Sequence, residues 1–190
     1  DKGRTTQAKK DALLARIHAT ASYEDLAGCD LVVEAVFEDR GIKAAVTKAA
    51  EAVLGPDAVF ATNTPGLPIT GLAEASVRPE NFIGMHFFSP VERMPLVEVV
   101  RGRKTSPAAL ARALDLVQAM KKTPIVVNDG PGFFTSRFIG AYINESLAMV
   151  TEGVNPALIE NAAKMAGIPV GPLTVSDEIG LDTAYHASQL

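Results

Sequence analysis

The sequence predicts an α/β fold with a doubly wound sheet, followed by an α-helical domain. Up to residue 128, short runs rich in Val and Ile alternate with helical patterns. After Asp129-Gly-Pro-Gly132, which is typical of a hinge, only helical patterns follow. Strands that alternate with helices indicate an α/β sheet, and helices alone indicate a separate domain. We therefore expect a sheet domain over residues 1–129 and the start of a helical domain over residues 130–190.

Five apolar runs predict the strands of this sheet. The first, Asp30–Val36, is rich in β-branched residues and is typical of a buried parallel strand. Pro90 and Pro95 interrupt the chain between the third and fourth runs, so these two strands can lie alongside each other. The predicted strands cover residues 30–36, 58–62, 82–86, 96–100 and 124–128.

Apolar residues three and four positions apart predict the helices. Gly55-Pro56 is expected to close the second helix, and Ser106 is suited to cap the fourth. The predicted helices cover residues 4–18, 40–54, 70–75, 107–121, 134–152 and 156–166, and a last helix follows the loop 168–173.

The composition excludes several classes of protein. The 190 residues are 47% hydrophobic and carry a net charge of −4, which argues against binding to nucleic acid or an anionic membrane. No apolar run approaches the length of a membrane span. The single cysteine, Cys29, excludes an internal disulfide and favours a reducing, cytoplasmic location. Since the chain opens in a charged helical pattern without Met, we expect a fragment, truncated at both ends, of a longer protein.

His86 and Glu98 are the first candidates for chemistry. Each lies in an apolar run, and the two runs are expected to lie side by side. A carboxylate among Leu and Val is costly to bury unless it meets a polar or cationic partner, and the imidazole is the natural one. A His held by a Glu makes a general base with a fixed tautomer. The alternative is a buried His beside an acid that has only a structural role.

Two loops at strand ends are the second candidates. Val36-Phe37-Glu38 and Asn63-Thr64-Pro65 each follow a predicted strand, and Lys43 lies on the helix after the first loop. In doubly wound sheets, ligands bind beyond the carboxyl ends of the strands. The two loops could line one crevice, or they could be ordinary connections.

Other motifs are absent or incomplete. Gly130-Pro131-Gly132 lacks the third glycine of a dinucleotide-binding fingerprint, and its proline lacks an amide donor. The three histidines lie far apart in sequence, so no metal site is predicted. The sequence contains no G-x-S-x-G turn, so nothing in it indicates a serine hydrolase. His186 is interpreted as structural rather than catalytic.

Several longer motifs together resemble the 3-hydroxyacyl-CoA dehydrogenase family, and most of all the dehydrogenase portion of the multifunctional α subunit of the fatty-acid β-oxidation complex. The resemblance covers nearly the whole chain. Its motifs are Asp30-Leu-Val-Val-Glu-Ala-Val-Phe-Glu38, Asn63-Thr64, Arg78-Pro-Glu-Asn-Phe-Ile-Gly-Met-His-Phe-Phe-Ser-Pro90, Met94-Pro-Leu-Val-Glu-Val-Val100, Thr123-Pro-Ile-Val-Val-Asn-Asp129, Pro131-Gly-Phe-Phe134 and Gly180-Leu-Asp-Thr183.

The resemblance implies a partial Rossmann-type domain that binds NAD, followed by a helical domain used for dimerisation. The glycine-rich NAD loop is then expected upstream of Asp1. The implied reaction is oxidation of (3S)-3-hydroxyacyl-CoA to 3-oxoacyl-CoA in fatty-acid β-oxidation. In multifunctional relatives an enoyl-CoA hydratase domain precedes this region, and a thiolase subunit is a possible partner in the complex.

The resemblance also implies roles for individual residues. His86 matches the catalytic base and Glu98 the acid that orients it. Ser136, in the helix after the hinge, matches a substrate-binding position. The positions expected to bind NAD or border its site are Val36, Phe37, Glu38, Lys43, Asn63, Pro65 and Ser89.

Two positions depart from the family pattern. Pro65 replaces a serine whose hydroxyl would bond the substrate oxygen, and Ser136 replaces an asparagine. Pro65 has no donor at all, whereas Ser136 can still donate to a thioester carbonyl. Weakened activity is therefore one expectation. The alternatives to a dehydrogenase of the multifunctional complex are a 3-hydroxybutyryl-CoA dehydrogenase of the same fold and a non-catalytic assembly module.

Overall fold

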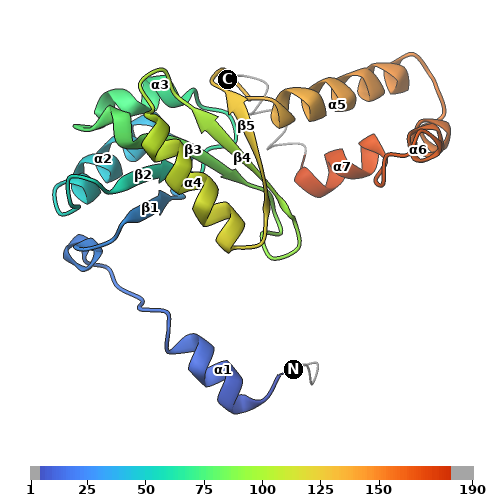
Figure 1. Ribbon diagram of the computed structural model, residues 1–190. Helices are drawn as coiled ribbons and strands as arrows, with labels where there is room; N and C mark the ends of the chain where they lie inside the picture. The colour runs from blue at the N-terminus through green and yellow to red at the C-terminus, as the bar shows by residue number, and fades with distance from the viewer. Residues whose placement is uncertain (1–4, 181–190) are drawn as a thin grey trace.

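The computed structural model describes residues 5–180 and contains a five-stranded sheet with helices on both faces (Figure 1). The sheet has the strand order β1-β2-β3-β4-β5. All neighbours pair in parallel except β3 and β4, which are antiparallel. The predicted α/β fold is therefore confirmed. The strands are β1 Leu31–Glu34, β2 Val59–Thr62, β3 Phe82–Phe87, β4 Leu96–Arg101 and β5 Thr123–Asn128.

Alternate side chains of the strands point to opposite faces of the sheet, and each face has its own core. On one face, Met85 and Val99 pack with Ala113 and Val117 of helix α4 (Pro107–Ala119). On the other, Phe60 stacks on Phe82 and packs with helices α2 (Arg40–Glu51) and α3 (Ile69–Leu72). Gly84 permits this second packing, because a Cβ there would lie 2.7 Å from Cδ1 of Ile69 on α3. The second face also carries the polar residues Glu34, Thr62, His86 and Glu98.

The helices of the sheet domain begin with side-chain caps where the sequence offers them. The Asp39 carboxylate accepts a hydrogen bond from the Ile42 amide at 2.8 Å, and Ser106 does the same for Ala109 at 3.1 Å. Short 3₁₀ turns at residues 23–26, 73–75 and 79–81 complete the connections. The helices are α1 Gln7–Leu14, α2 Arg40–Glu51, α3 Ile69–Leu72 and α4 Pro107–Ala119.

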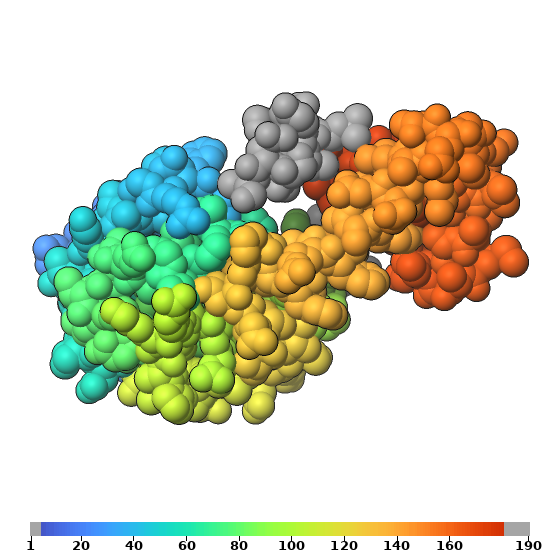
Figure 2. All heavy atoms as spheres, turned by 90° about the horizontal axis from the view of Figure 1, so that it is seen from above, coloured from blue at the N-terminus to red at the C-terminus, as the bar shows by residue number. Residues whose placement is uncertain are grey.

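Three helices follow β5 and lie to one side of the sheet. They are α5 Thr135–Thr151, α6 Pro156–Met165 and α7 Pro172–Ile179, and α7 runs back along α5 (Figure 1). Seen from above, they form a separate lobe joined to the sheet domain through the start of α5 (Figure 2). The described part of the region after residue 130 thus contains helices and their connections but no strand, as predicted.

The first predicted helix and the first predicted strand are shorter in the structure, as is the helix predicted over residues 40–54, which ends at Glu51. The helix predicted over residues 4–18 ends at Leu14, and its apolar residues Leu13 and Ile17 are exposed. This segment lies away from the sheet (Figure 1), and a short helix gains little stability without a packed apolar face. The strand predicted as buried over residues 30–36 covers only Leu31–Glu34. It lies at an edge of the described sheet, and Val33 is 37% exposed.

Candidate active site

His86 and Glu98 lie directly opposite each other on the antiparallel strands β3 and β4. The imidazole Nδ1 is 2.7 Å from Oε2 of Glu98. Glu98 is fully buried and His86 is 8% exposed. The contact predicted from the two apolar runs is therefore confirmed. With Nδ1 directed at the carboxylate, the neutral imidazole carries its free lone pair on Nε2, as a base requires.

Four hydrogen bonds converge on the Glu98 carboxylate. The amides of Phe134 and Thr135 donate to Oε1 at 3.2 and 2.8 Å. The Thr135 hydroxyl donates to Oε2 at 2.6 Å, beside His86. Burial is the largest influence on the pKa of Glu98 and raises it, but the hydrogen bonds of His86 and Thr135 together lower this pKa below its usual value of 4.5.

The lowered pKa has a consequence for stability. A carboxyl group whose pKa is lower in the folded than in the unfolded state stabilises the fold above the unfolded pKa. This stabilisation is lost as the pH falls through the lower, folded pKa. The Glu98 contribution is thus complete above about pH 4.5 and declines below it.

The start of α5 reaches Glu98 through a tight turn after β5. Gly132 and Phe133 both adopt positive φ, at 70° and 47°. The Gly132 amide donates to the Gly66 carbonyl at 3.1 Å, which ties the turn to the loop after β2. Phe133 is buried and its ring centroid lies 6.4 Å from that of His86. The predicted hinge is therefore a packed turn that delivers two amides and a hydroxyl to the carboxylate.

A second buried network lies at the carboxyl end of β1. The Lys43 ammonium is 2% exposed and bonds Glu34 at 3.0 Å. Glu34 also accepts from the Thr62 hydroxyl and the Val36 amide, both at 2.7 Å. Oε2 of Glu38 lies 3.4 Å from the same ammonium, so Lys43 has two carboxylate partners. Sequence reasoning found Lys43 and Glu38 but missed Glu34, although its place in an apolar run gave the same signal that identified Glu98.

The two candidate loops lie beside each other at the carboxyl ends of β1 and β2, because these strands are parallel. The Thr64 hydroxyl bonds the Glu38 carboxylate, which joins one loop to the other. Asn63 accepts from the Phe87 amide at 2.9 Å and so joins the loop after β2 to the end of β3. The structure therefore brings the predicted loops together. Val36 and Phe37 lie there with exposed side chains, and Phe37 is 82% exposed.

The two departures from the family pattern touch each other. The Ser136 hydroxyl donates to the Pro65 carbonyl at 2.9 Å. Ser136 belongs to the first turn of α5, beside the Thr135 that bonds Glu98. Ser89 lies two residues beyond the end of β3, and its hydroxyl forms no hydrogen bond with residues 5–180. His186 and residues 181–183 of the last motif lie outside the described residues.

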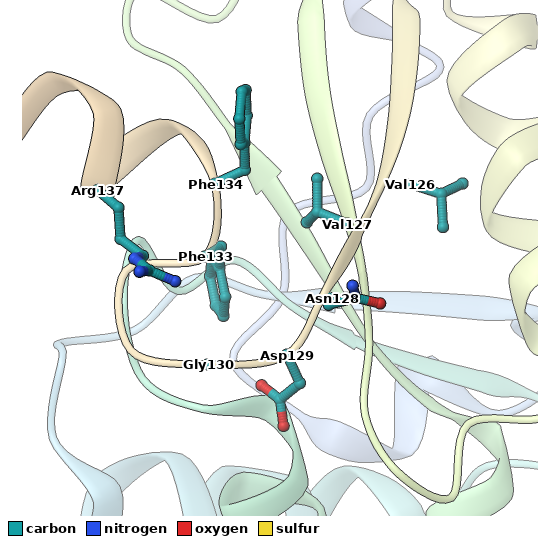
Figure 3. A pocket seen from close by; sticks show the side chains of 8 residues that line it. All are labelled: Val126, Val127, Asn128, Asp129, Gly130, Phe133, Phe134 and Arg137. Atoms are coloured by element: carbon teal, nitrogen blue, oxygen red, sulfur yellow. The ribbon is translucent and has the colours of Figure 1, made fainter.

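A hollow of about 340 Å³ lies beside β5 (Figure 3). Its lining comes from β5, the following turn and the start of α5, namely Val126, Val127, Asn128, Asp129, Gly130, Phe133, Phe134 and Arg137. The Asp129 carboxylate accepts hydrogen bonds from the amides of Ile69 and Thr70, at the start of α3. That aspartate therefore has a structural role in anchoring the turn.

Every helix within residues 5–180 is too short or too polar to span a membrane. No cluster of three or more metal-ligating side chains occurs among the same residues.

Known proteins match the chain over nearly its whole length. Family profiles described as "3-hydroxyacyl-CoA dehydrogenase, NAD binding domain" and "3-hydroxyacyl-CoA dehydrogenase, C-terminal domain" match residues 1–130 and 132–190. The fatty acid oxidation complex subunit alpha of Shewanella baltica is 44% identical over 97% of the chain, and that of Psychrobacter arcticus is 44% identical over all of it. The chain spans 26% of the length of each.

Solved structures agree with these matches. The (S)-3-hydroxybutyryl-CoA dehydrogenase of Ralstonia eutropha superposes with a TM-score of 0.93 at 38% identity, over 99% of this chain and 67% of the other. Since both family profiles and this structure match a chain whose sheet places a His–Glu pair at its centre, the chain belongs to the 3-hydroxyacyl-CoA dehydrogenase family.

Proposed function

We propose that the full-length protein oxidises (3S)-3-hydroxyacyl-CoA to 3-oxoacyl-CoA with NAD⁺ in cytoplasmic fatty-acid β-oxidation. The observation that carries this proposal is the buried His86–Glu98 pair at 2.7 Å, with Nε2 free to act as base. In this reaction His86 takes the proton of the 3-hydroxyl group. Glu98 then stabilises the imidazolium that forms, and the hydrogen bonds of His86 and Thr135 lower the pKa of Glu98 and so favour its ionised form.

Part of the NAD⁺ site is present at the carboxyl ends of β1 and β2. Val36 and Phe37 offer exposed apolar surface, with Glu38, Lys43 and Asn63 around them. An apolar surface with a few polar groups suits a nicotinamide ring, so these residues fit the cofactor. Pro65 and Ser89 would border the same site. The bound cofactor supplies the acceptor for the hydride that leaves C3 of the substrate.

The position of Ser136 supports a role in holding the substrate. Its hydroxyl lies in the first turn of α5 on a half-buried residue, next to Thr135, which anchors Glu98. In the described structure it donates to the Pro65 carbonyl, and it can rotate to donate to a thioester carbonyl instead. The substrate would then lie between the loop after β2 and the start of α5.

The direct test is steady-state formation of NADH with 3-hydroxyacyl-CoA substrates of increasing chain length. A medium-chain preference supports the multifunctional role, whereas a C4 preference supports a 3-hydroxybutyryl-CoA dehydrogenase, the reading favoured by the likeness to the Ralstonia eutropha enzyme. Absence of turnover with every chain length would contradict both and favour an assembly module.

Replacing Pro65 with Ser is expected to raise turnover. Proline has no side-chain donor, and one oxyanion-type donor typically contributes about a hundredfold in rate. The new hydroxyl would lie in the loop that Asn63 joins to β3, so we expect an increase of up to about a hundredfold. NADH formation by the variant measures it, with Pro65→Ala as control for loss of the ring. Equal rates in the two variants would exclude a role for the hydroxyl.

We also propose that two copies pair through the helical region and that a thiolase subunit binds the complete protein. Large apolar side chains are exposed on these helices, including Phe134, Phe138, Met149, Leu158 and Met165. Scattered exposure is normal, but several such residues on one lobe indicate an interface. Sedimentation velocity of the full-length protein is expected to show a dimer or larger species. A monomer at tens of micromolar would contradict the proposal.

A further inference from the structure

The two oxygens of the Glu98 carboxylate have different partners. Within residues 5–180, the donors to Oε1 are the backbone amides of Phe134 and Thr135. Oε2 is shared between His86 Nδ1 at 2.7 Å and the Thr135 hydroxyl at 2.6 Å. The Thr135 hydroxyl, at the start of α5, therefore competes with the His86 imidazole for the same oxygen of Glu98.

Such competition has a defined electrostatic effect. Each hydrogen bond to a carboxylate stabilises its negative charge and reduces the attraction that remains for a neighbouring cation. A hydroxyl on the shared oxygen thus weakens the preference of Glu98 for an imidazolium. Removing the hydroxyl while keeping the shape of the side chain leaves a stronger acceptor for His86.

We propose that Thr135 is a positioning residue that, through Oε2 of Glu98, sets the pH at which His86 becomes an effective base. The proposal rests on the proposed function, in which His86 is the base. It also gives the start of α5 a role in the reaction besides joining the two parts of the chain. Thr135 itself need not touch the substrate, because its effect passes through Glu98.

The other charged groups nearby are occupied elsewhere. Asp129, after β5, binds the amides at the start of α3, and Lys43 on α2 pairs with Glu34 and Glu38. Arg137, one turn into α5, lines the hollow beside β5. On the β3–β4 connection, Glu92 and Arg93 lie 3.9 Å apart and are largely exposed. Within residues 5–180, His86 is the titratable group that lies against the Glu98 carboxylate.

The chain contains a matched control for this arrangement. Glu160, on α6, accepts hydrogen bonds from the start of α7: the amides of Leu173 and Thr174 donate to Oε1, and the Thr174 hydroxyl donates to Oε2 at 2.8 Å. This is the same pattern as Glu98 with Phe134 and Thr135, but it contains no histidine. Thr174→Val therefore removes an equivalent hydrogen bond at a carboxylate that has no part in the proposed reaction.

The experiment compares Thr135→Val, Thr135→Ser and Thr174→Val with the unmodified full-length protein. We expect Thr135→Val to move the acid limb of the kcat/KM–pH profile up by about 0.5–1 pH unit. Thr135→Ser should restore the original limb, and Thr174→Val should leave it in place. The same shift is expected in the NMR titration of the His86 imidazole with ¹³C-labelled histidine, assigned by comparison with His86→Gln. A purely structural role for Thr135 would lower the melting temperature without moving either midpoint.

The two readouts separate failure of this inference from failure of the proposed function. An unchanged His86 titration in a folded Thr135→Val protein would overturn the inference, whether or not the enzyme turns over. A shifted titration with an unshifted rate limb would also overturn it, because Thr135 would then not act through the catalytic base. If the unmodified protein shows no turnover but the titration shifts and Ser restores it, the coupling stands and the proposed reaction fails. If Thr135→Val does not fold, the comparison of Thr135→Ser with Thr135→Cys decides, since a thiol is the weaker donor and is expected to shift the titration upward.

Discussion

Glu98→Gln is expected to lower the turnover number of the full-length protein by about 10²- to 10⁴-fold. The side chain keeps its shape but loses the charge that stabilises the imidazolium. The contacts of Glu98 also restrict the new amide. Two backbone amides donate to Oε1, so the carbonyl oxygen of Gln must take that place. Its NH₂ group then faces Nδ1 of His86 and favours the tautomer that carries its proton on Nε2, which cannot act as a base.

Steady-state NADH formation with a 3-hydroxyacyl-CoA substrate measures this effect. The Michaelis constant is expected to change little, since the pair acts mainly in the transition state. Glu160→Gln is the matched control, because Glu160 has the same helix-start donors but no histidine. Near-normal turnover of Glu98→Gln in an active protein would show that the assignment of His86 and Glu98 is wrong.

Glu34→Ala is expected to lower the free energy of unfolding by about 3–5 kcal/mol. Its carboxylate is the closest partner of the Lys43 ammonium, and both side chains are almost completely buried. Removal leaves a buried cation whose remaining partner, Glu38, is 3.4 Å away and partly exposed. It also leaves the Thr62 hydroxyl and the Val36 amide without the acceptor they share.

Urea denaturation of the variant measures the loss. The control is the double variant Glu34→Gln with Lys43→Met, which removes both charges and should recover much of the stability, because a buried ion pair can be replaced by neutral groups at small cost. A loss below about 1 kcal/mol for Glu34→Ala would place this pair with ordinary surface ion pairs. That result would contradict the buried network described for the carboxyl end of β1.

The sequence by itself determined the succession of strands and helices along the chain and the contact between His86 and Glu98. Strand and helix patterns depend on residues close together in the chain, so they can be recognised locally. The His–Glu contact could also be predicted, because a carboxylate inside an apolar strand requires a partner and the neighbouring run offered one histidine. The same reasoning would have found Glu34 with Lys43 if applied to the first strand.

Other features were decided by the tertiary structure alone. The helix predicted over residues 4–18 stops at Leu14, because no apolar face of the described chain packs against it. The hydrogen bond from the Thr135 hydroxyl to Glu98 depends on the turn after β5, in which two residues adopt positive φ angles. Contacts between residues 37 positions apart leave no local pattern in the sequence, since loop geometry and packing bring them together. The contacts of Glu98 with the start of α5 could therefore be identified only from the folded chain.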